Sequence, residues 1–535
     1  MTKERPEVIA PSEIRPGCVL ARIEWAVAIV LTALAVGCHF AVFRYAGALW
    51  RDEVTTINLA TMPTLADIWN NLQFESFPLA WILIVRAWAA VAGPDNDTAL
   101  RLLGFLVGLG VLGVIWLAVR KFMKQPFPLL ALVLVGFNSG LVFWGDSLRA
   151  WGLGSLTIIL AAGLLWQVVQ EPTRWRIVLA ALVSVLAVQT AYHNIPLLLA
   201  IGLAAMGVAA RRRQWRRVIL VGAIGLLAAL TLLPYAFGVQ TYGGNSNIIG
   251  YGQANLSHGN TDFVRYGLEF ALLLGSAGNF MIFVWAALIA VGVAAATIAQ
   301  VRGFSPKLTS PQRDLALFAG LILVVSFAAF AAFLWALNYP TNPWYFLILT
   351  VVIAVALEAA TGVFLASRGW RIVRLVVVVV LAAACLLCGW EGFVTRQTNL
   401  DLIAASLQSR ADKDDLIVIR YWAMGTTFDR YYKGPTPWET IPPLKDHKFQ
   451  RVNQLPKEFW SATDYDKILR TAVDDMTRTL RGGHKVWLVG RPVLRPGLID
   501  RLMLDHALSH TSEKFCDRAI KYENPILEVA EGWRE

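Results

Sequence analysis

Long runs of apolar residues separated by short polar segments dominate the first 395 residues of the chain. A helix needs about 20 apolar residues to cross the roughly 30 Å hydrocarbon layer of a membrane. Several runs reach that length, whereas others, such as 177–190, are shorter. The runs lie at 25–43, 102–119, 127–144, 150–168, 177–190, 195–210, 217–238, 279–299, 315–337, 344–366 and 372–390. The pattern predicts an α-helical polytopic membrane protein with about eleven transmembrane helices.

A long segment between the first two runs, residues 44–100, is predicted to form one loop on the outer side of the membrane. Within it, the apolar stretch 78–92 is short for a span and carries Arg86 between two tryptophans. Such a stretch favours an interfacial or re-entrant helix. Residues 63–73 are expected to form a second, shorter helix of this kind.

Basic residues mark alternate ends of the apolar runs, which sets the predicted orientation. The chain is 56% hydrophobic and only 16% charged, with a net charge of +11. Most Lys and Arg residues of the first 395 fall in six clusters, at 3–22, 120–124, 174–176, 211–217, 302–313 and 368–374. This asymmetry is typical of the positive-inside rule and places the clusters and the N-terminus in the cytoplasm. The charge is thus explained by topology, and no module typical of nucleic-acid binding accompanies it.

The composition changes near residue 395. Residues 1–394 form the predicted transmembrane unit, and residues 395–535 carry basic and acidic residues in nearly equal numbers. Short apolar runs at 415–419 and 485–490 are typical of buried strands between helices. We therefore expect a small α/β domain, which an odd number of spans places in the periplasm of a bacterium. The five cysteines show no spacing typical of a metal site or a disulfide framework.

Charged residues at the outer ends of the apolar runs are the candidates for chemistry, because charge beside lipid is costly. They are Asp52, Glu53, Glu75, Arg101, Asp146, Arg149 and His193. Asp146 and Arg149 are three residues apart, so they are expected to share a helix face. Structural interpretations stay open: Asp52 as a helix cap, Asp146 and Arg149 as a local ion pair, His193 as a packed interfacial residue and Glu75 as a solvated loop carboxylate.

Five segments taken in order resemble the GT-C membrane glycosyltransferases, in the branch that contains protein O-mannosyltransferases, aminoarabinose transferases and rhizobial lipopolysaccharide-core transferases. The segments are RDE at 51–53, FPLAWILIV at 77–85, RLLG at 101–104, DSLRAWGLGSL from 146 and PWYFLILTV at 343–351. In the last of these, Trp344 stands where the family often has Arg, and Tyr345 is a further candidate site residue.

The resemblance implies a reaction and roles for these residues. Family members transfer a sugar, with inversion, from a polyprenyl-phosphate donor to a hydroxyl acceptor. Asp52 would be the general base, with Glu53 and Asp146 as further catalytic candidates, and Asp146 would orient Arg149 or lie near the acceptor. Arg149 and Arg101 would bind the donor phosphate. In the aminoarabinose branch a loop Glu and a His bind a metal, and Glu75 occupies a similar place, but no metal or other cofactor is predicted here.

The sequence thus predicts a glycosyltransferase of the bacterial inner membrane that acts on a periplasmic glycan, lipid or protein. Its predicted partners are the sugar donor, this acceptor and the membrane lipid, and nucleic acid is not among them. The alternative is a transporter or flippase of a lipid-linked saccharide, for which ionisable groups near the bilayer midplane and internal repeats are typical. A non-catalytic assembly protein of the same fold is a third possibility.

The orientation can be measured with reporter fusions. Positive-inside counting places residue 535 outside and residues 211–217 inside the cell. A reporter that is active only in the periplasm should therefore be active after residue 535 and inactive after residue 213. The reverse pattern would overturn the orientation and move the candidate site to the cytoplasmic face.

Overall fold

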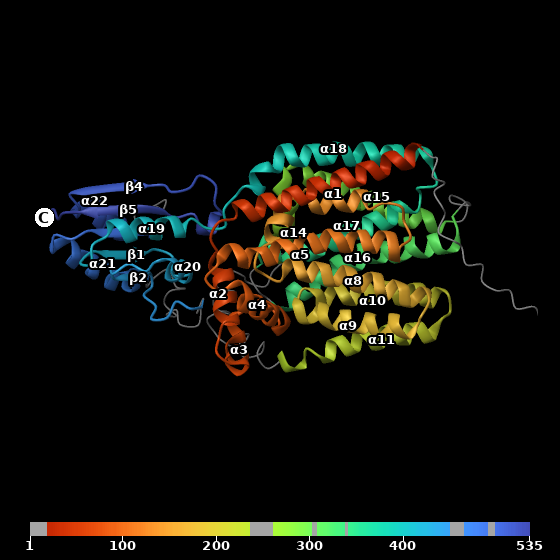
Figure 1. Cartoon of the computed structure of the whole chain (residues 1–535), viewed down its shortest axis with the longest axis horizontal. Coiled ribbons are helices and arrows are strands. Elements are labelled where there is room, and N and C mark those ends of the chain that lie inside the picture. The colour runs from red at the N-terminus through yellow and green to blue at the C-terminus, as the bar shows by residue number, and fades with distance from the viewer. Residues whose placement is uncertain (1–18, 236–260, 302–307, 338–340, 450–464, 491–497) are drawn as a thin grey trace, which may run out of the picture.

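The computed structural model describes residues 19–235, 261–301, 308–337, 341–449, 465–490 and 498–535. Figure 1 shows a long bundle of helices with a smaller α/β domain at one end. Parts of the segments 239–278 and 338–343, which lie between predicted apolar runs, and of the basic clusters at 3–22 and 302–313, lie outside the described residues.

The predicted apolar runs coincide with helices of the bundle. Among the described residues, nine helices are long and apolar enough to span a membrane. The 177–190 run lies in α9, which is 17 residues long, and the 127–144 run is broken into α6 and α7. The bundle helices are α1 (Val19–Tyr45), α5 (Asp97–Leu117, continued by the π-helix η2, Ala118–Phe122), α6 (Leu129–Gly136), α7 (Ser139–Gly145), α8 (Trp151–Gln170), α9 (Arg174–Thr190), α10 (Asn194–Arg211), α11 (Trp215–Leu230), α15 (Phe280–Gln300), α16 (Ser310–Leu337), α17 (Leu347–Gly362, preceded by η4, Pro343–Phe346) and α18 (Arg368–Phe393).

Short helices cover the end of the bundle that faces the α/β domain (Figure 1). Two of them match the expected interfacial segments: α3 (Leu65–Asn71) with η1 (Leu72–Phe74), and α4 (Leu79–Ala92). Another, α2 (Arg51–Ala60), was expected only as loop and begins six residues after α1 ends. The segment 239–278, between two predicted apolar runs, contains α14 (Thr261–Leu274) and η3 (Gly275–Ala277).

The C-terminal domain is built around a five-stranded sheet of order β2-β1-β3-β5-β4. The strand β1 pairs in parallel with β2 and β3, whereas β5 runs antiparallel to β3 and β4. The two predicted strands are confirmed as β1 and β3. The elements are α19 (Leu400–Arg410), β1 (Leu416–Ile419), α20 (Met424–Tyr431), β2 (Trp438–Thr440), α21 (Tyr465–Arg481), β3 (Val486–Gly490), α22 (Leu498–His506), β4 (Ser509–Glu513), η7 (Lys521–Glu523) and β5 (Ile526–Glu531).

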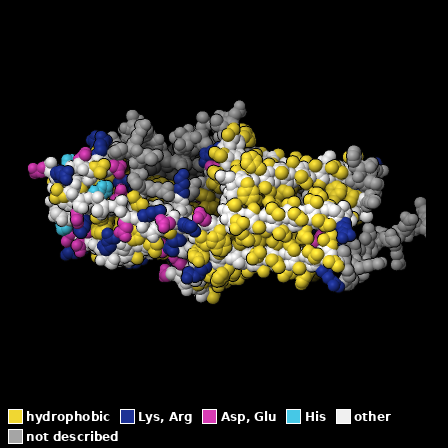
Figure 2. Space-filling model, turned by 90° about the horizontal axis from the view of Figure 1, so that it is seen from above, with side chains coloured by type: hydrophobic (Ala, Val, Ile, Leu, Met, Phe, Trp, Pro, Cys, Tyr) yellow, Lys and Arg dark blue, Asp and Glu magenta, His cyan; other side chains and the backbone are white. Residues whose placement is uncertain are grey.

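The two units differ sharply in surface chemistry. Figure 2 shows hydrophobic side chains along the flank of the bundle, while acidic and basic side chains gather on the α/β domain. The apolar flank suits lipid, which offers no hydrogen bonds to polar groups. The chain is therefore a multi-pass membrane protein with one domain beyond the apolar belt.

The helix α17 lies at the centre of the bundle, since all of its 16 residues are buried. Its carboxylate Glu358 forms an ion pair with Arg374 of α18. The same carboxylate accepts hydrogen bonds from the amides of Leu130 and Ala131 at 2.7 and 3.0 Å. These amides belong to the first turn of α6, which otherwise lacks acceptors. Glu358 thus neutralises a buried charge and caps a helix.

A glycine permits the close contact between α5 and the segment that joins α7 to α8. A Cβ atom added to Gly104 would lie 1.9 Å from the backbone oxygen of Asp146. On the same helix, a Cβ atom added to Gly113 would meet nothing within 4 Å. The approach of the backbones therefore requires glycine at position 104 and not at 113.

The two glycines give a matched pair of variants. We expect Gly104→Ala to destabilise the protein by about 1–3 kcal/mol, because the backbone must shift to admit the methyl group. Gly113→Ala should be neutral or slightly stabilising, since alanine is the better helix former. Thermal unfolding of both variants in detergent measures the difference. Equal midpoints would contradict the close packing at Gly104.

Candidate active site

A buried ion pair anchors the beginning of α2. Both terminal nitrogens of Arg101, on α5, donate to the Glu53 carboxylate at 3.2 and 3.0 Å. The same carboxylate accepts the amides of Trp50 at 3.2 Å and Leu148 at 2.6 Å. Arg101 also donates to the carbonyls of Gly47 and Ala48. Glu53 therefore joins α2, α5 and the segment before α8 at one point.

The ion pair between Glu53 and Arg101 determines the direction of the neighbouring side chain of Asp52. Adjacent residues of a helix are about 100° apart around its axis. Because Glu53 is fully buried in the protein, Asp52 faces a different side and its carboxylate is 21% exposed. One of its oxygens accepts a hydrogen bond from Arg51 Nε at 3.4 Å. Asp52 lies in the first turn of α2, where the helix dipole favours negative charge.

A second buried charge pair lies beside Asp52. Arg149 Nη1 is 2.7 Å from one oxygen of Glu75 and 2.9 Å from the other. This nitrogen also donates to Thr56 Oγ1 at 2.8 Å and to the backbone oxygen of Asp52 at 3.1 Å. The Arg149 guanidinium lies over the ring of Phe77, 4.7 Å from its centroid. Glu75, Arg149 and the backbone of Asp52 thus form one cluster.

Aromatic side chains continue from this cluster into the bundle. The Phe77 ring packs edge-on against Trp151, and the Trp151 ring contacts His193 and Tyr345 with centroids 4.9 and 5.5 Å apart. Burial lowers the pKa of His193 to about 3, so its ring is neutral. Its Nδ1 atom is buried without a hydrogen-bond partner among the described residues. These rings, of Phe77, Trp151, His193 and Tyr345, are called the aromatic wall. It presents apolar ring surfaces together with the unsatisfied Nδ1 atom of His193.

Burial also acts on the two carboxyl groups that pair with arginine. It raises the pKa of Glu53, while Arg101 and the amide of Leu148 oppose the rise. It raises the pKa of Glu75, which Arg149 and Thr56 oppose. Each carboxylate depends on its arginine, because a buried charge left without a partner is strongly destabilising.

The prediction that Asp146 and Arg149 share a helix face is wrong. The helix α7 ends at Gly145 and α8 begins at Trp151, so both residues lie in a non-helical segment. The Asp146 carboxylate lies 2.7 and 2.9 Å from Nδ1 of His39 on α1, while Arg149 turns to Glu75. Asp146 therefore does not orient Arg149 through its carboxylate.

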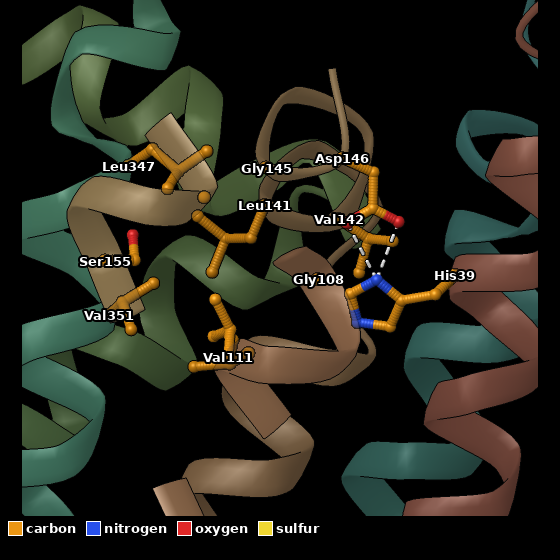
Figure 3. A pocket seen from close by; sticks show the side chains of 12 residues that line it. His39, Gly108, Val111, Leu141, Val142, Gly145, Asp146, Ser155, Leu347 and Val351 are labelled. Carbon is orange, nitrogen blue, oxygen red and sulfur yellow. Dashed lines mark hydrogen bonds and ion pairs between the residues drawn. The ribbon is translucent and has the colours of Figure 1, made fainter. Parts of the chain in front are cut away.

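Figure 3 shows His39 and Asp146 facing one another at the side of a small cavity inside the bundle, with Leu141, Val142 and Val351 nearby. The pair needs Gly108 on α5, because a Cβ atom there would lie 2.1 Å from Asp146 Oδ1. The interaction joins α1 to the segment 146–150, which carries Leu148 and Arg149.

The structure brings most of the predicted residues together at one end of the bundle. Glu53 with Arg101, and Glu75 with Arg149, flank Asp52, and the aromatic wall connects Arg149 with His193 and Tyr345. Several residues that complete these contacts were not among the residues predicted from the sequence. They are His39, Arg51, Thr56 and Phe77. Arg51 and Thr56 are close to Asp52 in sequence, whereas His39 and Phe77 contact residues in distant parts of the chain.

The Glu75 carboxylate of this cluster is engaged by protein groups. Among the described residues, no three His, Cys, Asp or Glu side chains gather as metal ligands. The Glu75 oxygens already accept hydrogen bonds from Thr56, Arg149 and the amide of Ser76. Glu75 therefore acts as a partner of Arg149 in this arrangement.

Comparison with known proteins bears on the fold. No protein-family model and no curated protein matches the sequence. The apo crystal structure of ArnT from Cupriavidus metallidurans is similar with a TM-score of 0.50 at 14% identity, covering 95% of this chain and 98% of that chain. ArnT bound to undecaprenyl phosphate gives a TM-score of 0.49 at the same identity, with the same coverage.

The crystal structure of the Archaeoglobus fulgidus oligosaccharyltransferase in complex with Zn and sulfate is also similar. It has a TM-score of 0.50 at 13% identity and covers 86% of this chain and 68% of that chain. Both ArnT and this oligosaccharyltransferase are GT-C glycosyltransferases. At such low identity the likeness concerns the arrangement of helices. The chain therefore has the GT-C fold that its sequence predicts.

Proposed function

We propose that the protein is an inverting glycosyltransferase that moves a sugar from a polyprenyl-phosphate donor to a hydroxyl acceptor. One observation carries the proposal: a partly exposed carboxylate, Asp52, lies beside the arginine cluster at the end of a GT-C membrane bundle. This arrangement combines a proton acceptor and a cation close to the lipid surface. Transfer from a lipid phosphate requires both groups.

Asp52 is the proposed general base. Its carboxylate would take the proton of the acceptor hydroxyl as the oxygen attacks the anomeric carbon. Glu53 is unsuited to this role, because it is fully buried and its carboxylate already accepts Arg101 and two backbone amides. Asp146 is likewise paired, with His39. Among the three acidic candidates, Asp52 is the one whose side chain is partly exposed, at 21%.

Arg149 is the proposed ligand of the leaving phosphate. All of its hydrogen bonds within the described part of the chain use Nη1, which leaves Nε and Nη2 for a ligand. The planar guanidinium suits two parallel hydrogen bonds to phosphate oxygens. Phe77 and Glu75 hold it in place. Stabilising the departing phosphate is the larger electrostatic task of the reaction.

We assign the second phosphate-binding cation to Arg51 and not to Arg101. Arg101 donates to Glu53, Gly47 and Ala48, which engages each of its three nitrogens. Arg51 lies next to Asp52, between the rings of Trp50 and Tyr421. Its Nη1 is buried and has no hydrogen-bond partner among the described residues. Arg51 therefore has donor capacity beside the proposed base.

The lipid and the acceptor would reach the site from different sides. The helix α4, too short to span, would hold the donor lipid near its phosphate. ArnT has been crystallised with undecaprenyl phosphate, and the Archaeoglobus fulgidus oligosaccharyltransferase with a tethered acceptor peptide. We place the site on the periplasmic face of a bacterial inner membrane, with a glycan, lipid or protein as acceptor. Residues 1–394 would form the transferase module and residues 395–535 a periplasmic domain.

A transporter function, the competing proposal, agrees less well with the charged residues buried within the bundle. Transporters use ionisable groups near the midplane to bind their cargo. Glu358, the deep carboxylate, is occupied by Arg374 and by two amides of α6. It therefore holds the bundle together and has no evident cargo.

Replacing Asp52 tests the general base. Asp52→Asn is nearly isosteric but cannot take a proton, so transfer should fall by roughly 100- to 10,000-fold while donor binding persists. The assay measures sugar transfer from a radiolabelled polyprenyl-phosphate donor by the purified protein. Asp95→Asn, at an exposed carboxylate on the same end of the bundle, is the matched control and should retain activity. Unchanged transfer by Asp52→Asn would remove the base. Absence of transfer by the wild type with every donor tried would favour the flippase.

Replacing Arg149 tests the phosphate contact. Arg149→Lys keeps the charge but loses the planar fork, so kcat/KM for the donor should fall by about tenfold or more. Arg44→Lys, at an exposed arginine at the end of α1, should leave it unchanged. The same assay applies over a range of donor concentrations. If Arg149→Ala turned over donor at the wild-type rate, the assignment of Arg149 to the phosphate would be withdrawn.

A further inference from the structure

The backbone amides at the beginning of α2 and just before it receive their hydrogen-bond acceptors from two different parts of the chain. The helix begins at Arg51, and Leu49 and the N-cap residue Trp50 precede it. The amide of Trp50 donates to Glu53, within the helix itself. The amide of Leu49 donates to the hydroxyl of Tyr431 at 2.7 Å, and that of Arg51 donates to Glu523 Oε1 at 3.0 Å. Tyr431 and Glu523 lie more than 370 residues further along, in the C-terminal domain. The domain therefore caps the beginning of the helix that carries Asp52.

Tyr431 is held firmly in this position. It is the last residue of α20, and its hydroxyl donates to Asp97 Oδ2 at 2.6 Å. The neighbouring Arg430 pairs with the other oxygen of Asp97 at 2.6 Å. Because the hydroxyl proton is directed at Asp97, its oxygen is available to accept the Leu49 amide. Asp97 thus links α20 to the beginning of α5.

Glu523 is equally fixed. The residue is fully buried at the end of η7, and its two oxygens accept hydrogen bonds from Thr427 Oγ1, each at 3.0 Å. The backbone oxygen of Glu523 accepts the amide of Asn399 at 3.2 Å. A buried carboxyl group is costly unless it is hydrogen-bonded. Its bond to Arg51 explains why the domain keeps one at this position.

We propose that Glu523 and Tyr431 are positioning residues of the active site, which fix the first turn of α2 and thereby the carboxylate of Asp52. The proposal rests on the proposed function for the role of Asp52. The membrane bundle would hold α2 through Glu53 and Arg101, and the C-terminal domain would hold it through the two caps. The domain would then be part of the catalytic unit.

The expected consequence follows from geometry. An unsatisfied first turn frays, because its amides lack partners inside the helix. Asp52 directly follows the capped residue Arg51, so fraying moves its carboxylate. A displacement of about 1 Å can cost roughly 100-fold in rate. Loss of a cap should therefore lower kcat and leave the KM for the donor nearly unchanged, since Arg149 remains in place.

Other contacts between the two units serve as controls. Arg518 and Glu391 form an ion pair across the junction at 3.0 Å, with both side chains more than half exposed. Glu391→Ala removes a carboxylate at the junction without touching α2, and exposed pairs of this kind contribute little. Like Glu523→Ala, it replaces a glutamate with alanine, so it is a control for Glu523→Ala.

Two variants test Glu523 and one tests Tyr431. Glu523→Ala removes the acceptor of the first amide of α2, and Tyr431→Phe removes the acceptor of the Leu49 amide just before the helix. Burial raises the pKa of Glu523 to about 8, so at neutral pH the group is mostly the neutral acid. Glu523→Gln keeps its size, its neutrality and an acceptor oxygen, and should therefore behave as the wild type.

Hydrogen–deuterium exchange of the full-length protein in detergent provides a readout independent of activity. In peptides covering residues 49–53, Glu523→Ala and Tyr431→Phe should exchange roughly five- to tenfold faster than the wild type, as expected for the loss of one hydrogen bond. Glu523→Gln and Glu391→Ala should exchange at the wild-type rate. The kcat for transfer should fall in the first two variants and recover in Glu523→Gln.

The outcomes separate this inference from the proposed function. Unchanged exchange in both Glu523→Ala and Tyr431→Phe, with the fold verified by thermal unfolding, would overturn the capping. Faster exchange with unchanged kcat would overturn the positioning role. Faster exchange together with an inactive wild type would support the capping while the proposed function fails. If Glu523→Ala does not fold, Tyr431→Phe decides by the same criteria.

Discussion

The buried ion pair between Glu53 and Arg101 is the interaction on which the arrangement of the candidate site depends. It joins the beginning of α2 to α5 and, through the amide of Leu148, to the segment that carries Arg149. Neither charge would be tolerated alone in this buried position. The pair thereby sets the rotation of α2, which directs Asp52 away from the core.

The charged residues of the bundle fall into two kinds once their partners are known. Glu53, Glu358 and Asp146 have their oxygens engaged by arginine or histidine, and two of them by backbone amides as well, so they connect helices. Asp52, Arg51 and Arg149 retain exposure or donor capacity and lie close together. Burial penalises unpaired charge. Unused hydrogen-bonding capacity of charged side chains at one end of the bundle therefore points to a ligand.

The fold also explains why a soluble domain accompanies the membrane bundle. A helix that begins at the membrane surface needs acceptors for its first amides, and the side chains of lipid-facing helices rarely supply them. Glu523 supplies one of them from the C-terminal domain, and Tyr431 of the same domain accepts the amide of Leu49 just before the helix. The polar domain and the apolar bundle thus meet at the helix that carries the candidate base.

The sequence by itself determined the membrane class, the position of the apolar runs, a short apolar helix within 78–92 and the two strands β1 and β3, because hydropathy and strand patterns are local properties of the chain. The GT-C fold was predicted from the resemblance of five ordered segments to that family, and the likeness to the ArnT structure agrees with it. It also named most of the charged residues that gather at one end of the bundle. Only the tertiary structure decided their partners. Asp146 lies three residues from Arg149 but pairs with His39, and Glu75, for which a solvated loop carboxylate was one open interpretation, pairs with Arg149. Glu523 reaches Arg51 across 472 residues. Such contacts depend on how helices pack in space, and no local pattern of residues encodes that packing.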